Sequence, residues 1–343
     1  MYTNQSIKRI GFACKWAEVN KKGELASTEG LNTGGTTHAW AKRNIRSKVE
    51  EKIIDVAKRN ILNTHALVKK VATLPHELRM LRLTSDMFSF YTMDEYKDFW
   101  KNPYIQNLLE HWMAPIGETA RANDVRLSFH PDQFVVLASD RPEVVNKSIE
   151  EFEYHVDMAR FMGYGKQFQD IKINVHIAGR AGVEGMRAVL PRLSQEARNT
   201  ITIENEEISY GLNDCLQLSD VIPIVLDIHH HWIREGEYIQ TGDDRVKRVI
   251  DSWRGLRPTC HYSVSREDIL VNHCVHTLPN HKVLLESGHN KQKLRAHSDY
   301  YWNHAVNEWA IRFNENFDIM CESKAKNLAS FKLYDTYINA KQT

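Results

Sequence analysis

The stretch Pro223–Trp232, PIVLDIHHHW, decides the fold. Ile224, Val225 and Leu226 predict a strand that is buried on both faces. Asp227 and three histidines follow this strand directly. Acid and imidazole side chains at the carboxyl end of an apolar strand indicate a metal site. The alternative is that the aspartate caps a helix and the histidines line a polar loop.

Five further apolar runs end in the same way, with one histidine or glutamate where each run stops. The runs are RLSFHPDQ (126–133), KINVHIAG (172–179), TITIENEE (200–207), PTCHYS (258–263) and DIMCESK (318–324). The residues that end them are His130, His176, Glu204, His261 and Glu322. Six coincidences of this kind are hard to attribute to loop composition, so the pattern favours a shared metal centre.

Strands and helices alternate along the whole chain. The expected strands are 8–15, 78–83, 125–130, 171–178, 201–205, 223–228, 258–264 and 317–322. Eight strands that alternate with helices predict an α/β fold, a single (β/α)8 TIM barrel over residues 1–343, rather than an open doubly wound sheet. We expect a long first βα loop at 16–44 and a C-terminal extension at 325–343.

In a barrel all strand ends meet on one face, so these side chains are expected to converge. Imidazoles and carboxylates without thiolates suit Mn²⁺, Zn²⁺ or Fe²⁺. The side chains at the strand ends are more numerous than the ligands that one ion needs, and two-metal sites are typical of phosphate ester cleavage. At least one of His229 and His231 is expected to point away from the site. The residues expected to converge are His130, His176, Glu204, Asp227, His230, His261 and Glu322.

Composition bounds the class of protein. Lys and Arg number 45 against 44 Asp and Glu, so the net charge of +1 gives no global basic field. Five cysteines without a CxxC pair favour a reducing compartment. No run approaches the roughly 18 apolar residues that span a bilayer. We therefore expect a cytoplasmic protein with no membrane partner.

The chain carries an ordered set of short motifs: GFACKWAE, GGTT, RLTSD, FHPDQF, VHIAG, IENEE, LDIHHH, WRG, HYSVSRED, AHSDYY and ESKAK. Together they resemble the UV damage endonuclease family, which has a (β/α)8 barrel related to endonuclease IV. The resemblance implies a DNA repair enzyme that hydrolyses the phosphodiester immediately 5′ to a UV photoproduct or another distorting lesion. It also implies damaged double-stranded DNA as partner and two or three ions, usually Mn²⁺, with Zn²⁺ or Mg²⁺ as alternatives.

The resemblance assigns ligands residue by residue. His130, His176 and Glu204 match the ligands of one ion, and His230 and His297 match those of a third. From spacing alone, His297 is only a histidine in a loop. The ligands of the second ion, which also form the expected catalytic group, are Glu204, Asp227, His261 and Glu322.

Further motif positions point to DNA. Gln133 and Phe134 match a pair that the family inserts into the duplex at the lesion. Phe12 and Trp16 could stack on a flipped base, although ordinary core packing is the alternative for Phe12 and Phe134. Basic residues close to strand ends, which could meet phosphates, are Lys15, Lys324 and Lys326.

Two positions depart from the family pattern. Thr259 replaces a lysine that stands two residues before the seventh-strand histidine, and Met93 replaces a further histidine. Three alternatives stay open: an abasic-site endonuclease of endonuclease IV type, a metal-dependent barrel sugar isomerase, and a damage-binding protein that does not cleave. We expect a monomer. The remaining histidines expected on the surface or a helix face are His38, His65, His76, His155 and His304.

Overall fold

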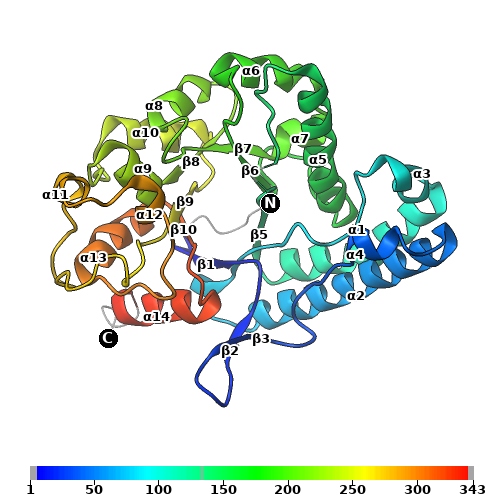
Figure 1. The fold of residues 1–343 in the computed structure, drawn as a ribbon, viewed down its shortest axis with the longest axis horizontal. Helices are drawn as coiled ribbons and strands as arrows, with labels where there is room; N and C mark the ends of the chain where they lie inside the picture. Colours follow the sequence, from blue (N-terminus) through cyan, green and yellow to red (C-terminus); the bar gives the residue numbers. More distant parts are fainter. Residues whose placement is uncertain (1–5, 133, 339–343) are drawn as a thin grey trace.

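The computed structural model describes residues 6–132 and 134–338. Eight parallel strands form a closed barrel in the order β1-β10-β9-β8-β7-β6-β5-β4, which confirms the predicted (β/α)8 barrel (Figure 1). Closure pairs every strand on both sides and leaves no free edge. The barrel strands are β1 (Ile10–Ala13), β4 (Met80–Arg82), β5 (Arg126–Phe129), β6 (Lys172–His176), β7 (Ile201–Glu204), β8 (Ile224–Asp227), β9 (Thr259–Tyr262) and β10 (Asp318–Cys321).

Helices surround the barrel (Figure 1). Short 3-10 turns extend or connect several of them. The α-helices are α1 (His38–Ala41), α2 (Arg46–Ala72), α3 (Lys97–Trp100), α4 (Pro103–Ala122), α5 (Pro142–Phe161), α6 (Gly182–Val189), α7 (Gln195–Thr200), α8 (Leu212–Cys215), α9 (Ile228–Glu235), α10 (Asp244–Ser252), α11 (His281–Glu286), α12 (Lys291–Leu294), α13 (His304–Ile311) and α14 (Asn327–Tyr337).

Several segments differ from the sequence prediction. The first βα segment contains an antiparallel hairpin, β2 (Ala17–Val19) with β3 (Leu25–Ser27), which projects from the barrel (Figure 1). Helix α9 begins directly after β8. The Asp227 carboxylate caps it by accepting from the His230 amide at 2.7 Å, as in the alternative considered for this stretch. Helix α14 occupies the expected C-terminal extension and packs against β1. These elements are short or lack a clear apolar period, so the sequence pattern does not reveal them.

The interior of the barrel is partly polar. Side chains alternate along a strand, so Lys172, Asn174 and His176 of β6 point to the same side. Buried polar residues also stand on the neighbouring strands, including Ser128 of β5 and Thr202 of β7. The space beneath the strand ends is therefore lined by groups that can hydrogen-bond to the residues above them.

The glycine-rich segment TGGTT (33–37) is fixed against α2. Buried Asn60 of α2 accepts from the Gly34 amide at 3.0 Å and donates to the Gly34 carbonyl at 2.9 Å. Both backbone polar groups of Gly34 are therefore bonded within the protein. His155, expected on the surface or a helix face, lies on the inner face of α5: its side chain is fully buried, between the Glu151 carbonyl and the Ser85 hydroxyl, each at 2.8 Å.

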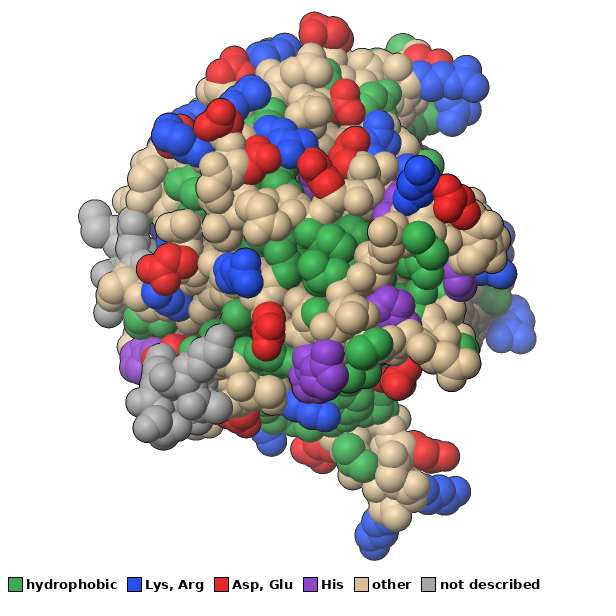
Figure 2. Space-filling model, turned by 90° about the vertical axis from the view of Figure 1, so that its left-hand side faces the viewer, with side chains coloured by type: hydrophobic (Ala, Val, Ile, Leu, Met, Phe, Trp, Pro, Cys, Tyr) green, Lys and Arg blue, Asp and Glu red, His purple; other side chains and the backbone are tan. Residues whose placement is uncertain are grey.

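Figure 2 shows one face of the molecule, on which acidic and basic side chains are intermingled, in keeping with the net charge of +1. Within residues 6–132 and 134–338, no helix combines the length and the apolar character needed to cross a bilayer.

A buried charge cluster closes the N-terminal end of the barrel. Asp318, at the start of β10, is fully buried. Arg126 reaches one carboxylate oxygen at 2.7 Å and Arg257 reaches the other at 2.8 Å, while the Arg9 guanidinium lies 3.5 Å away. The cluster ties β1, β5 and the approach to β9 to β10. Since every charge has a partner of opposite sign, this end of the barrel is structural.

The first prediction concerns this cluster. Replacing Asp318 by alanine leaves three arginines around an empty position, so we expect the free energy of unfolding to fall by about 3–5 kcal/mol. The control is Asp220→Ala, which breaks an exposed pair with Arg187 and is expected to cost far less, because water screens exposed charges. Urea unfolding measures both. Equal losses in the two variants would contradict a stabilising role for the buried cluster.

Candidate metal centre

The register of the sheet pairs the predicted ligands across neighbouring strands. His176 of β6 lies opposite Glu204 of β7, and Asp227 of β8 lies opposite His261 of β9. All four stand at or near the carboxyl ends of their strands. Residues that are up to 85 positions apart in the chain are therefore neighbours because the barrel aligns the strand ends.

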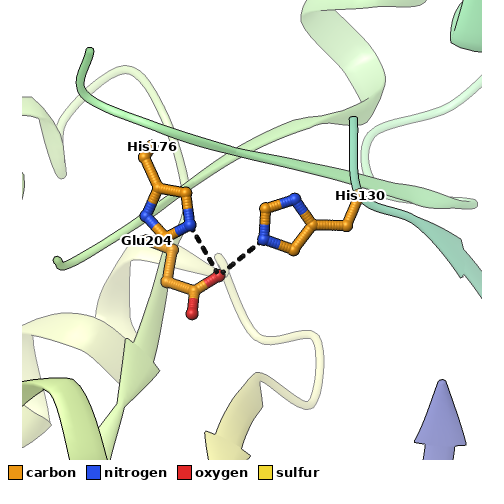
Figure 3. A group of neighbouring side chains, drawn as sticks. All are labelled: His130, His176 and Glu204. Carbon is orange, nitrogen blue, oxygen red and sulfur yellow. Dashed lines mark ion pairs between the residues drawn. The ribbon is translucent and has the colours of Figure 1, made fainter. Parts of the chain in front are cut away.

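The first candidate ligand group is His130, His176 and Glu204 (Figure 3). The Nε2 atoms of His130 and His176 lie 3.3 Å and 3.9 Å from the same carboxylate oxygen, Oε2 of Glu204. Both imidazoles point toward that oxygen (Figure 3). Nδ1 of His176 is buried and has no hydrogen-bond partner among the described residues.

The second candidate group shares Glu204 with the first and adds Asp227 and His261. Nδ1 of His261 lies 2.9 Å from Oε1 of Glu204 and 3.4 Å from Oε1 of Glu322. All three members of the group are fully buried. Oδ2 of Asp227 is buried without a hydrogen-bond partner within the described part of the chain. A buried carboxylate oxygen with an open lone pair is a natural ligand for a cation.

Only one of the three consecutive histidines faces the cluster. Nδ1 of His230 lies 3.6 Å from Asp227 Oδ2 and 3.8 Å from Glu204 Oε1. His229 is held at both nitrogens by serine hydroxyls, at 2.7 and 3.1 Å, and Nε2 of His231 contacts Glu237 at 2.8 Å. Because α9 turns by about 100° per residue, consecutive side chains point in different directions.

The outer members of the set lie around this core. Glu322 is paired with Arg82 of β4. His297 forms an isolated β-bridge with Ser265, and its ring lies 6.2 Å from that of His229. The structure does not place His297 within either of the closely spaced ligand groups of the described residues.

The cluster shifts the pKa values of its members in opposite directions. Burial alone raises the pKa of Glu204, but His261 and His176 outweigh it and hold the pKa well below its usual range. Burial lowers the pKa of His261 to about 4, whereas the carboxylates of Asp227 and Glu204 overcome burial at His230 and raise its pKa to about 9. A neutral His261 can offer a lone pair to a cation.

The donor set fits divalent cations. It provides imidazole nitrogens and carboxylate oxygens without thiolates, and Glu204 belongs to both groups, so two ions could share it. Asn174 orients this carboxylate by donating to Oε2, and the Thr202 hydroxyl in turn donates to Asn174 at 2.8 Å. Such outer partners fix the direction in which a ligand points.

The aromatic residues predicted to contact DNA differ in their exposure to solvent. Phe134 is 77% exposed, four residues after His130. Phe12 is fully buried and Trp16 is 7% exposed, and both pack edge-on against Phe331 of α14. This packing argues against a stacking role for Phe12 and Trp16, since their faces are covered by the core. Gln133 lies outside the described residues.

Basic side chains stand close to the ends of two strands. Lys15 and Lys324 are exposed, and Lys326 is half-buried with positive φ. A hollow of about 730 Å³ is lined mainly by the segment 266–275, and Trp302 and Lys324 also line it. Lys324 is thus a predicted site residue that borders open space.

The two departures from the family pattern differ in burial. Thr259 is fully buried on β9, and its hydroxyl has no hydrogen-bond partner within the part of the chain that the structure describes. Met93 is half-buried and packs against the main hydrophobic core.

Four residues near the centre were not predicted. Arg82 pairs with Glu322, Asn174 holds Glu204, and Lys172 contacts His261. Glu207 lies 3.6 Å from His230 and is held by Arg295 at 2.8 Å. Arg82, Lys172 and Asn174 had one usable signal, a charged or amide side chain inside a strand that is otherwise apolar.

Fold and site together define a class, the (β/α)8 barrels with a candidate metal site at the carboxyl ends of the strands. Two solved structures share the fold. The crystal structure of SacUVDE matches with a TM-score of 0.72 at 22% identity and covers 98% of this chain and 99% of that chain. The crystal structure of endonuclease IV from Thermus thermophilus matches with a TM-score of 0.53 at 11% identity and covers 98% of this chain and 100% of that chain.

The chain belongs to the UV-endonuclease UvdE family, whose sequence profile matches residues 8–342. A UV DNA damage endonuclease of Bacillus cereus (strain G9842) is 26% identical over 304 residues, 86% of each chain. One from Bacillus thuringiensis subsp. konkukian (strain 97-27) is 27% identical over 290 residues, 82% of this chain and 81% of the relative. Membership of this family supports a DNA repair endonuclease.

The second prediction tests which of the three consecutive histidines contributes to metal binding. In His230→Gln we expect Mn²⁺ to bind about 100-fold more weakly, since even outer partners of metal ligands are worth roughly 10–100-fold in affinity. His231→Gln, the matched control, changes a buried side chain that contacts Glu237 and not the cluster, and is expected to bind Mn²⁺ like the unaltered protein. Calorimetric titration of both proteins measures the affinity. A larger loss in His231→Gln would contradict this geometry.

Proposed function

We propose that the protein hydrolyses a phosphodiester in damaged double-stranded DNA, immediately 5′ to a UV photoproduct or another distorting lesion. The observation that carries this proposal is the buried Glu204 carboxylate, which is shared by two groups of potential metal ligands at the mouth of the barrel. Family membership supports the repair role. Two or three divalent ions of the Mn²⁺ type are the proposed cofactor, with Zn²⁺ or Mg²⁺ as alternatives.

The proposed ligands follow the two groups. His130, His176 and Glu204 would hold one ion. His230 and His297, on the rim of the cluster, would hold a third. Divalent ions at such a site supply Lewis acidity, which activates water and offsets the charge that develops on the leaving oxygen. The residues that would hold the second ion are Glu204, Asp227, His261 and Glu322.

The chain itself supplies position and charge. The buried carboxylates stand at the carboxyl ends of the strands, so a phosphodiester would approach from that face of the barrel. Arg82, which neutralises Glu322, and the nearby basic residues Lys15, Lys324 and Lys326 would bind backbone phosphates on that face. This local group of cations provides the attraction to DNA that the net charge of the chain does not.

Phe134 is the proposed lesion probe, together with Gln133. Its ring is 77% exposed, so it is free to contact a partner. It follows His130 by four residues, so a duplex bound over the metal centre would lie within its reach. An aromatic ring inserted at a weakened base step can stack on the bases there.

The deciding experiment is the cleavage of three labelled duplexes that carry one cyclobutane dimer, one abasic site or no lesion, each with Mn²⁺ and with EDTA. We expect a nick 5′ to the dimer that requires Mn²⁺. Cleavage of the abasic duplex alone would favour an endonuclease of the endonuclease IV type. Binding without cleavage would favour a damage sensor. The absence of both binding and cleavage would overturn the proposal.

The third prediction tests the shared carboxylate. Glu204→Ala removes a ligand from both groups, and we expect nicking of the dimer duplex to be abolished. The control is Glu206→Ala, two residues further on, because that carboxylate accepts from the Ser209 amide at 2.7 Å and belongs to neither group. Initial rates of nicking measure both variants. Near-normal cleavage by Glu204→Ala would contradict the proposal that Glu204 is a shared metal ligand required for nicking.

The fourth prediction tests the probe. Phe134→Ala should weaken binding to the dimer duplex by about 1–3 kcal/mol, the usual value of one base–aromatic stack, while Mn²⁺ affinity stays unchanged. Tyr104→Ala removes another exposed aromatic, 73% exposed on α4, and should leave DNA binding unaltered. Fluorescence anisotropy with damaged and undamaged duplexes measures the difference. If both variants lose the same affinity, Phe134 has no specific role.

A further inference from the structure

A lysine lies inside the barrel beneath the candidate metal centre. Lys172 begins β6 and is 3% exposed, and the structure places its Nζ atom 3.0 Å from Nε2 of His261. It stands four residues before His176 on the same side of the strand, so its backbone lies about 13 Å below that ligand. The long side chain therefore reaches up through the interior to the ring of a residue on another strand.

The contact holds the ring of His261 from below. On its opposite side, Nδ1 of His261 lies 2.9 Å from Glu204 and 3.4 Å from Glu322. The two ring nitrogens thus have different neighbours, an amine at Nε2 and carboxylates at Nδ1. A ring that was rotated by half a turn would lose both interactions at once.

The Lys172 amine contacts the His261 imidazole although smaller polar side chains stand on β5 and on β9. Ser128 is directly opposite Lys172 on β5, and its buried hydroxyl has no hydrogen-bond partner in the described ranges, as is also true of Thr259. The Lys172 amine contacts the His261 imidazole and neither of these hydroxyls. Burying an amine is costly unless it is paired, and here the carboxylates beyond His261 provide the opposite charge.

We propose that Lys172 is a positioning residue of the metal centre, which orients the His261 imidazole so that Nδ1 faces the shared carboxylate. Lys172 donates to Nε2, so the proton on the ring stands at Nδ1 and is donated to Glu204 until a cation takes its place. Asn174, on the same side of β6, orients Glu204 in a similar way. The inference rests on the proposed function in one respect, that His261 holds a metal.

The test is the Mn²⁺ affinity of Lys172→Met, which keeps the length of the side chain and removes the amine. We expect binding to weaken by about 10–100-fold, the usual effect of losing an outer partner of a metal ligand. Ser128→Ala, directly across the strand pair, is the matched control and should bind Mn²⁺ like the unaltered protein. The melting temperature in EDTA, expected to be unchanged or higher for Lys172→Met, separates this effect from a loss of folding.

A second measurement does not depend on that variant. Two-bond ¹H–¹⁵N correlations of the histidine rings in the metal-free protein, assigned with His261→Gln, should show the His261 proton at Nδ1. A proton at Nε2, or normal Mn²⁺ affinity in folded Lys172→Met, would overturn the inference.

The two proposals fail in different ways. If the unaltered protein binds Mn²⁺ but does not nick the dimer duplex, the proposed function fails and the Lys172 measurements still decide the inference. If the unaltered protein does not bind Mn²⁺, both are overturned.

Discussion

The structure depends on how it accommodates one buried charge, the carboxylate of Glu204. Four imidazoles lie within 3.9 Å of it, those of His130, His176, His230 and His261. An ionised carboxylate in the interior of a protein costs several kcal/mol unless it is neutralised. The four rings come from four different βα units, so they reach Glu204 only when the barrel is closed in the observed strand order. Folding and assembly of the site are therefore the same event.

The two ends of the barrel differ in whether their buried carboxylates and imidazoles have all their hydrogen-bond partners. At the N-terminal end, Asp318 is surrounded by arginines and its oxygens are bonded. At the carboxyl end, Asp227 and His176 each keep a buried polar atom without a partner among the described residues. A site that is satisfied internally is stable but inert, whereas open lone pairs are available to a ligand. This contrast agrees with the general rule that barrels place stability at one end and chemistry at the other.

Polar residues inside the barrel connect the two ends. Lys172 and Asn174 of β6 reach His261 and Glu204, and Thr202 of β7 supports Asn174. Apolar side chains would pack the same space without setting the direction of the ligands. The cost of burying these polar groups is offset by their mutual hydrogen bonds, and the orientation that they provide is what a metal centre requires.

The sequence by itself determined the eight strands, the barrel and the residues at the strand ends, because strand periodicity and strand ends are local features of the chain. It did not reveal α9, so it could not decide which of His229, His230 and His231 faces the cluster. It also left open whether Phe12 stacks on a base or packs in the core, where α14 covers it, and it overlooked Lys172 and Arg82. These outcomes depend on contacts between segments up to 319 residues apart, such as Phe12 with Phe331. Only the tertiary structure brings such segments together, because register and helix packing fix where each side chain points.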